Sequence, residues 1–188
     1  MNESLLRLVE LQAGYQAPVV GPFNLTIDPG EVIGLSGPNG SGKSTLLKTI
    51  ANGARVFGGH VEKKPGLRLA WQQQQPVRPV EMPFSGRDYL HYADAEQTTV
   101  PSRLAEWLEQ RVDSLSGGQF QLLSVWAVLA SRADLVLLDE PTNNLDPAGD
   151  AILVKTLKAD LGRRAVLIVS HELGFLERTC SRILEVGE

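Results

Sequence analysis

A glycine-rich segment that joins a buried strand to a helix constrains the fold of this sequence more than any other feature. Residues 37–44 read Gly-Pro-Asn-Gly-Ser-Gly-Lys-Ser and match the pattern GxxxxGK followed by Ser or Thr. The apolar run at 32–35 predicts a strand before the loop, and Leu46, Leu47 and Ile50 follow it at helical spacing. This order of strand, loop and helix predicts an α/β fold with a mostly parallel sheet.

The loop has the chemistry of a phosphate-binding site. Its glycines let successive backbone N–H groups curl around a phosphate, and the helix N-terminus behind them adds positive potential. Lys43 would reach the β- and γ-phosphate oxygens of a nucleotide, and Ser44 would ligate Mg²⁺. A glycine turn that binds nothing is the alternative interpretation. The expected nucleotide contacts are Gly37, Pro38, Asn39, Gly40, Ser41, Gly42, Lys43, Ser44 and Thr45.

Two later apolar runs place an acidic pair beside this loop. The runs at 135–138 and 165–169 do not alternate with polar residues, which predicts strands buried on both faces of a parallel sheet. Asp139 and Glu140 follow the first run, at the strand end where ligands bind in open α/β sheets. Asp139 suits a magnesium shell and Glu140 suits an attacking water. A helix cap or a solvated edge is the alternative role for such a pair.

The rest of the chain predicts two smaller parts around this P-loop core. Residues 5–27 favour strands and would form an N-terminal antiparallel β subdomain. Asp146 and Pro147 predict the start of a helix that runs to Gly162. Helices are expected at 86–95 and 102–110, in a segment without strand-like runs. We expect one domain at 1–188, with a RecA-like core and β subdomain at 1–76 and 115–188 and a short α-helical subdomain at 77–114.

Composition narrows the class of protein. The net charge is -4, and charged residues are 21% of the chain and spread along it, which argues against a disordered tail or a large nucleic-acid-binding face. The single cysteine, Cys180, excludes an internal disulfide and a CxxC metal site and fits a reducing compartment. No apolar run approaches the roughly 18 residues of a membrane-spanning helix, and residues 1–4 begin no secretory signal. We expect a cytosolic protein that binds no nucleic acid and reaches a membrane only through a partner.

Residues 115–119 identify a family. They read Leu-Ser-Gly-Gly-Gln, in which Ser116 and Gln119 have the spacing of a capping box and alone predict only a helix start. Together with the P-loop and the acidic pair, this segment resembles the signature of ABC-type ATPases, the nucleotide-binding subunits of ATP-binding-cassette transporters. The resemblance covers roughly Leu8 to Val186. It implies ATP hydrolysis with ATP and Mg²⁺ as cofactors.

The resemblance also implies a dimer. In this family the signature of one protomer covers the γ-phosphate bound by the P-loop of the other, so two ATP molecules lie in a homodimer or pseudo-dimer interface. The first amides of a helix have no partner within the helix and can bind an anion. Here the anion would be the phosphate of ATP bound to the other protomer. The implied contacts across the interface are Ser116, Gly117, Gly118, Gln119 and Asp146.

Further roles follow from the resemblance alone. Tyr15 is similar to the aromatic residue that stacks on adenine, although an aromatic at such a place is ordinarily part of a core. Gln74 corresponds to the glutamine that contacts Mg²⁺ and the water, with Gln73 as the second choice, and a merely solvated glutamine is the alternative. His171 matches the switch histidine that contacts the γ-phosphate; an ordinary helix-start histidine is the alternative. The implied catalytic set is Lys43, Gln74, Glu140 and His171.

The chain departs from the family after the signature. The family usually has Gln-Arg and then an Ala-Arg-Ala helix, whereas residues 120–128 read Phe-Gln-Leu-Leu-Ser-Val-Trp-Ala-Val, so two customary arginines are absent. We expect the absence of these arginines to affect the orientation of the signature helix and its coupling to the rest of the protein, and not the binding of ATP. The helical segment is also short for the family, and with the chain ending at Glu188 we expect no C-terminal regulatory domain.

The resemblance implies an integral-membrane permease as partner, with this subunit peripheral on the cytoplasmic face of the membrane. The segment from Met82 to Phe84, followed by Tyr89 and Leu90, most resembles the zinc/manganese uptake ATPases. A permease contact is expected in the cleft bounded by Gln74, Met82, Pro83, Phe84 and Tyr89, where the alternative is a small core within the helical lobe. The alternative functions are transport of another substrate, a non-transport ABC ATPase that remodels DNA or ribosomes, and a nucleotide-binding regulator without turnover.

Overall fold

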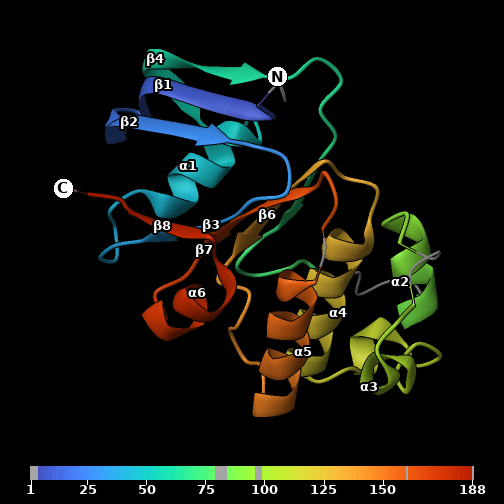
Figure 1. Cartoon of the computed structure of the whole chain (residues 1–188). Helices are drawn as coiled ribbons and strands as arrows, with labels where there is room; N and C mark the ends of the chain where they lie inside the picture. Colours follow the sequence, from blue (N-terminus) through green and yellow to red (C-terminus); the bar gives the residue numbers. More distant parts are fainter. Residues whose placement is uncertain (1–3, 79–83, 96–98, 160, 188) are drawn as a thin grey trace.

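The computed structural model describes residues 4–78, 84–95, 99–159 and 161–187. Within these ranges it contains two sheets, with helices between and around them (Figure 1). The elements in chain order are β1 (Leu6–Gly14), β2 (Pro18–Ile27), β3 (Val32–Ser36), α1 (Lys43–Ile50), β4 (Arg55–Lys63), β5 (Leu69–Gln72), α2 (Gly86–Tyr92), α3 (Ser102–Ala105), η1 (Val112–Ser114), α4 (Gly117–Ala130), β6 (Leu135–Asp139), α5 (Pro147–Lys158), β7 (Ala165–Val169), α6 (Leu173–Thr179) and β8 (Arg182–Glu185).

A five-stranded parallel sheet forms the centre, in the order β5-β6-β7-β3-β8. Every residue of β6 and β7 is buried, as expected for apolar runs without alternation. In the register of this sheet Asp139 pairs with Val169, so the ends of β6 and β7 lie level with each other. The predicted α/β fold with a mostly parallel sheet is confirmed. The edge strand β8, which the sequence analysis did not anticipate, completes it.

A three-stranded antiparallel sheet, in the order β2-β1-β4, lies on one side of the parallel sheet. Helix α1 lies between the two sheets and contacts strands of both (Figure 1). Its buried Leu46, Leu47 and Ile50 belong to a hydrophobic cluster shared with both sheets. Packing α1 in this position holds the loop before it against the end of β3.

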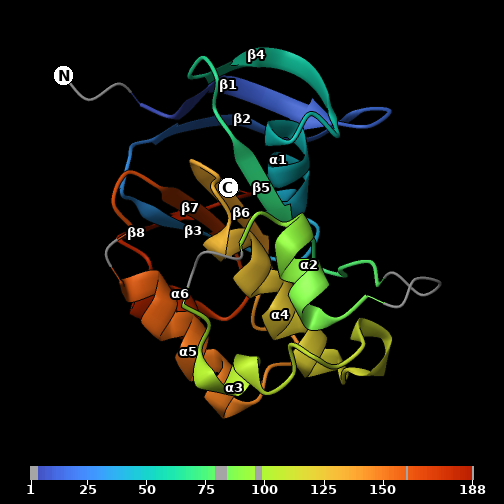
Figure 2. The same cartoon turned by 90° about the vertical axis from the view of Figure 1, so that its right-hand side faces the viewer.

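Helices α4, α5 and α6 cover the opposite face of the parallel sheet, where a second hydrophobic cluster includes Val125, Leu153 and Phe175. A third cluster lies between α2, α3, η1 and α4, around Leu90 and Phe120. Figure 2 shows α2 and α3 beside α4. Helix α4 therefore belongs to two clusters, because its apolar residues extend around most of its circumference. No helix in the described part of the chain is long and apolar enough to cross a membrane.

Two predicted helices are shorter than expected. The segment predicted as helix at 102–110 is α-helical only in α3. Beyond it, the amides of Trp107, Leu108 and Gln110 bond carbonyls three residues back, as in successive turns, and the carbonyls of Leu108 and Gln110 accept the amides of Arg87 and Gly86 at the start of α2. Helix α2 ends at Tyr92 rather than at 95, where Asp94 reverses the chain with φ 55°.

The helix that starts after Asp146 was expected to reach Gly162 but ends earlier. Its last residue is Lys158, and Gly162 has the left-handed φ of 61°. Leu161 still packs on the second cluster, although it lies beyond the helix. The apolar spacing that extended the predicted helix therefore continues through a loop.

Candidate functional site

The glycine loop between β3 and α1 requires its glycines at both ends. Gly37 has φ 136°, and a Cβ there would lie 2.3 Å from the carbonyl oxygen of Val186. Gly42, at the N-cap of α1, has φ 96°, and a Cβ there would lie 2.5 Å from Cβ of Val20. Both positions combine a left-handed backbone with a close neighbour, so a larger side chain would distort the loop.

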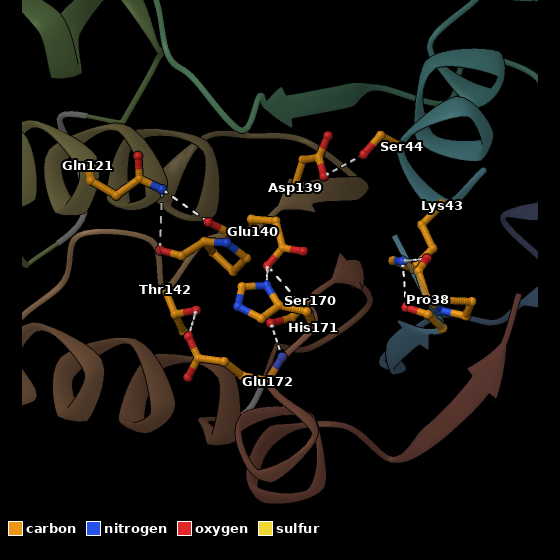
Figure 3. A network of polar contacts seen from close by, with 12 residues as sticks. Pro38, Lys43, Ser44, Gln121, Asp139, Glu140, Thr142, Ser170, His171 and Glu172 are labelled. Atoms are coloured by element: carbon orange, nitrogen blue, oxygen red, sulfur yellow. Dashed lines mark hydrogen bonds and ion pairs between the residues drawn. The ribbon is translucent and has the colours of Figure 1, made fainter. Parts of the chain in front are cut away.

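Lys43, the first residue of α1, lies folded over this loop. Its Nζ donates to the carbonyls of Gly37 and Pro38 at 2.7 Å each, and lies 3.5 Å from Oγ of Ser41 (Figure 3). The side chain is 7% exposed, so these oxygens replace water around a nearly buried ammonium. The loop therefore holds a cation at the helix N-terminus, where phosphate oxygens bind.

Ser44 and Asp139 meet beside the loop, as the sequence predicted for a magnesium shell. Ser44 Oγ donates to Asp139 Oδ1 at 3.0 Å. Burial raises the pKa of Asp139, and the charge of Glu140 adds to the increase, while the hydrogen bond from Ser44 opposes it. A hydroxyl and a carboxylate are the hard oxygen ligands that Mg²⁺ prefers, and a buried carboxylate gains most from a nearby cation. These residues fit a magnesium ion held together with substrate phosphates.

Glu140 lies at the end of β6, directly opposite His171. Its Oε2 lies 2.8 Å from Nδ1 of His171 and accepts the His171 amide at 3.3 Å. Its other carboxyl oxygen points toward the side of the site where Ser44 and Lys43 lie (Figure 3). Glu140 has φ 50°, an uncommon left-handed conformation for a residue with a side chain. The turn thus directs a nearly buried carboxylate across the ends of the strands.

Two contacts that the sequence analysis missed hold the segment after Glu140. Gln121 of α4 donates from Nε2 to the carbonyls of Glu140 and Pro141 at 3.4 and 3.3 Å. On the other side, Thr142 Oγ1 donates to Glu172 Oε1 at 2.7 Å. The sequence carried one signal for Gln121, since a polar residue within an otherwise apolar helical run is commonly bonded inside the core. It carried no comparable signal for Thr142.

A cleft of about 400 Å³ brings these residues together. Gln74 lies on its wall, whereas Gln73 lines a separate hollow, which favours the first choice over the second. Tyr15 does not line this cleft; it is 49% exposed, with Nζ of Lys48 5.5 Å from its ring centroid. The residues lining the cleft are Val19, Asn39, Gly40, Gly42, Lys43, Ser44, Thr45, Gln74, Glu140 and Val169.

The signature lies outside this cleft, at the start of α4. Ser116 forms the predicted capping box, since its Oγ accepts the Gln119 amide at 3.2 Å and Gln119 Oε1 accepts the Ser116 amide at 2.8 Å. Asp146 caps α5 by accepting the Gly149 amide at 2.8 Å, which lowers the pKa of its carboxyl, and Arg103 forms an ion pair with it. Ser116, Gly118, Gln119, Asp146 and Arg103 share a hollow of about 220 Å³. The chain therefore presents two separate polar sites.

Comparison with known proteins identifies the family. A family model described as ABC transporter matches residues 20–143, more than half of the chain. This chain belongs to the ABC transporter family. The zinc import ATP-binding protein ZnuC of Paracoccus denitrificans (strain Pd 1222) is 36% identical over 185 residues, which cover 91% of this chain and 70% of the relative. ZnuC of Jannaschia sp. (strain CCS1) is 32% identical over 191 residues, covering 96% and 78%.

Solved structures of the ABC family share this fold. A structure described as an inward-facing conformation of an ABC transporter superposes with a TM-score of 0.81 at 25% identity, covering 100% of this chain and 80% of the other. The ATP-binding subunit of another ABC transporter superposes with a TM-score of 0.83 at 23% identity, covering 97% and 86%. The ABC protein is the ATP-binding, ATP-hydrolysing subunit of a transporter. The comparisons do not favour the non-transport alternative.

Proposed function

We propose that this ABC ATPase powers a zinc importer by binding ATP between two copies and hydrolysing it there. The zinc assignment rests on the names of its relatives, the two zinc import ATP-binding proteins described above, which are 32% and 36% identical to this chain. The hydrolytic role rests above all on one observation, the Glu140 carboxylate held by His171 across the cleft from Lys43 and Ser44. Uptake of manganese or another substrate through the same cycle is the alternative.

Each polar group around the cleft has a role in this mechanism. Lys43 would leave the loop carbonyls for the β- and γ-phosphate oxygens, and Glu140 would orient or deprotonate the attacking water. His171 would contact the γ-phosphate while its amide keeps Glu140 in place, and Gln74 would reach the water from the opposite wall. Ser44 and Asp139, with Gln74, would hold Mg²⁺, which supplies positive charge to the transferring phosphoryl group.

A dimer follows from the separation of the two polar sites. The P-loop cleft contains a cation and a general-base candidate, whereas the hollow at the signature contains the N-terminus of α4 and no residue of the P-loop. Anions bind at helix N-termini, so the signature of one copy would complete the site around ATP held by the other. Tyr15 would stack on adenine, and Asp146 would lie near the copy-to-copy contact. We propose a homodimer or pseudo-dimer.

The permease would dock beside α2. A hollow of about 320 Å³ lined by Phe84, Tyr89, Tyr92, Ala93, Ala127 and Val128 has mainly apolar walls. An adjoining hollow, which shares Tyr89 and Val128 with it, extends to Gln73 and Val77. The exposed fractions of Val77 and Tyr92 are 82% and 73%, high for apolar surface. These features support the predicted contact at Phe84 and Tyr89, while Met82 and Pro83 lie outside the described residues.

This mechanism has consequences for the organisation of the chain. We propose that 77–114 moves as a helical subdomain against a core made by 1–76 and 115–188. The subunit would then work at the cytoplasmic face of the membrane, where it would bind its permease. Because α2 and α3 pack against α4, rotation of the helical subdomain would displace the start of α4 and shift the signature toward the partner's P-loop.

A glutamate substitution tests the catalytic part of the proposal. Glu140→Gln keeps the size and polarity of the side chain but removes the base, so turnover should fall about 10²- to 10⁴-fold while ATP affinity is retained. With MgATP this variant should form a dimer that light scattering detects, and adding Ser116→Arg should prevent it. Near-normal hydrolysis by Glu140→Gln would remove Glu140 from the role of base. A dimer that survives Ser116→Arg would contradict the composite site.

Transport assays test the substrate. The ATPase is purified with the membrane subunit that it retains and reconstituted in liposomes with the nucleotide site outside. Because an importer moves its substrate toward the side of the nucleotide site, ATP-dependent release of preloaded zinc from the liposome lumen is then compared with that of preloaded manganese, with the Glu140→Gln complex as the control without turnover. Release of manganese but not zinc would refute the zinc assignment and leave the ATPase assignment intact.

A further inference from the structure

We propose that Arg78 positions the signature helix and couples it to the nucleotide cleft. Arg78 NH1 donates to the carbonyl of Leu115 at 2.7 Å, and NH2 donates to the carbonyl of Ser116 at 3.0 Å. The same guanidinium lies 4.8 Å from the ring centroid of Phe120. One half-buried side chain from the segment after Gln74 thus makes three contacts with the first residues of the signature region. This inference rests on the proposed role of that signature in binding ATP.

The two carbonyls matter because peptide groups are rigid planes. The carbonyl of Leu115 shares its plane with the amide of Ser116, and the carbonyl of Ser116 shares its plane with the amide of Gly117. Fixing both carbonyls therefore fixes the direction of both amides, which point to the opposite side. The Ser116 amide already donates to Gln119 Oε1. The contacts of Arg78 therefore leave the Gly117 amide with a fixed direction and available to bind a ligand. The guanidinium charge also polarises both peptide groups in the sense that favours an anion at their amides.

An arginine is suited to this position and a lysine is not. The guanidinium forms a planar fork that bonds two acceptors at once and can also stack on an aromatic face, whereas an ammonium is a point charge. Phe120 is 3% exposed, and its ring also packs edge-on against Tyr89 at 5.6 Å between centroids. Arg78 therefore contacts a fixed surface rather than a mobile one. Phe120 begins the helical stretch that lacks the arginines customary in the family, and Arg78 brings a guanidinium to it from a different segment.

The same residue is tied to the nucleotide cleft by a short piece of chain. Gln74 lines the cleft, and Arg78 lies four residues later, so the two Cα atoms are separated by at most about 14 Å. Pro76, between them, has a fixed φ that removes one degree of freedom from this connection. A displacement of Gln74 toward ATP would consequently reach the carbonyls of Leu115 and Ser116 through Arg78. Such a link would let the cleft of a copy influence the signature of the same copy.

The test uses ATP-driven dimerisation of the Glu140→Gln protein, into which Arg78→Ala and Arg78→Lys are introduced separately. Arg87→Ala is the matched control, because Arg87 of α2 forms an exposed ion pair with Glu109 and lines neither the P-loop cleft nor the hollow at the signature. Loss of two charge-assisted hydrogen bonds should raise the ATP concentration for half-maximal dimerisation about 10- to 100-fold in Arg78→Ala. Arg78→Lys should be intermediate, and Arg87→Ala should equal the parent. Affinity of each monomer for a fluorescent ATP analogue should stay unchanged.

Hydrolysis by the otherwise wild-type chain gives a second measurement. Arg78→Ala should lower kcat about tenfold or more, with little change in the affinity for ATP, since the P-loop cleft itself is intact. Dimerisation of Arg78→Ala at the same ATP concentration as the control would overturn the proposal. This holds even if Arg78→Ala melts at a lower temperature, because Arg78 would then contribute only to stability.

If Arg78→Ala does not fold, the Arg78→Lys variant decides. Dimerisation of Arg78→Lys at the same ATP concentration as the Glu140→Gln parent would overturn the proposal. Failure of the Glu140→Gln parent itself to dimerise would instead refute the proposed dimer.

Discussion

The two glycines of the signature offer a matched test of how tightly α4 packs at its start. Both lie in the first turn of the helix, and neither has a left-handed backbone. A Cβ on Gly118 would lie 2.4 Å from the carbonyl oxygen of Asn144, whereas a Cβ on Gly117 would meet nothing within 4 Å. Alanine at 118 must therefore push α4 away from the turn that contains Asn144, whereas alanine at 117 fits without any displacement.

The expected energies differ in sign. In Gly118→Ala, backbone oxygen and methyl must separate by more than half an ångström, and overpacking of this kind costs about 1–3 kcal/mol. For a chain of this size, 1 kcal/mol shifts the melting temperature by about 2–4 °C, so Gly118→Ala should melt about 2–12 °C lower. Gly117→Ala should gain about 0.4–1 kcal/mol, because alanine restricts the unfolded chain and fits the helix.

Differential scanning calorimetry or a circular-dichroism melt of the nucleotide-free proteins measures the difference. Gly117→Ala should melt at or slightly above the parent temperature, and Gly118→Ala clearly below it. Equal melting temperatures for the two variants would show that the 144 turn moves aside without cost, and the reasoning from the close approach would then be wrong. The nucleotide-free state is used because ATP would stabilise the folded form by mass action.

Three other substitutions test ATP binding, docking of the membrane subunit and the stability of the fold separately. Lys43→Ala removes the cation that bridges the loop carbonyls, so binding of a fluorescent ATP analogue should weaken at least tenfold; unchanged affinity would exclude Lys43 from the phosphate site. Phe84→Ala should reduce co-purification of the membrane subunit while costing less stability than Leu90→Ala, whose side chain is 3% exposed and should cost about 2–5 kcal/mol. A strongly destabilised Phe84→Ala protein that retains its membrane partner would sink the docking proposal, because Phe84 would then be a core residue.

The parts of the fold that depend on local sequence were predictable. The runs at 135–138 and 165–169 were predicted as buried strands and form β6 and β7, and the predicted glycine loop joins β3 to α1. Strand β4 was missed because none of its nine residues is fully buried, and it becomes a strand by pairing with β1. Segment 102–110 looked helical, but beyond Ala105 it forms successive turns whose end bonds the start of α2. That contact between separate segments is a tertiary effect that spacing cannot reveal.

The candidate site shows the same division. Lys43, Ser44, Asp139 and Glu140 were found because each lies in a short motif whose surroundings are also local. The contact between Glu140 and His171 was not expected in detail, since it joins the ends of two neighbouring strands, and only the register of the sheet brings them level. Residues such as Gln121 and Thr142, which connect the motifs, belong to no motif themselves. The only sign of Gln121 in the sequence is a polar residue within an apolar helical run.

Helix α4 connects the two polar sites within one chain. Its first turn carries the signature, and Gln121, in the next turn, bonds the carbonyls of Glu140 and Pro141. The signature and Gln121 belong to one rigid helix. A shift of the signature large enough to engage a partner's nucleotide must therefore also move Gln121, or break its bonds to the carbonyls of Glu140 and Pro141. Arg78 would restrain the same helix from the side of Gln74. The geometry therefore links the signature to the Glu140 carboxylate of its own copy, which in the proposed dimer would give each half a physical route to respond to ATP in the other.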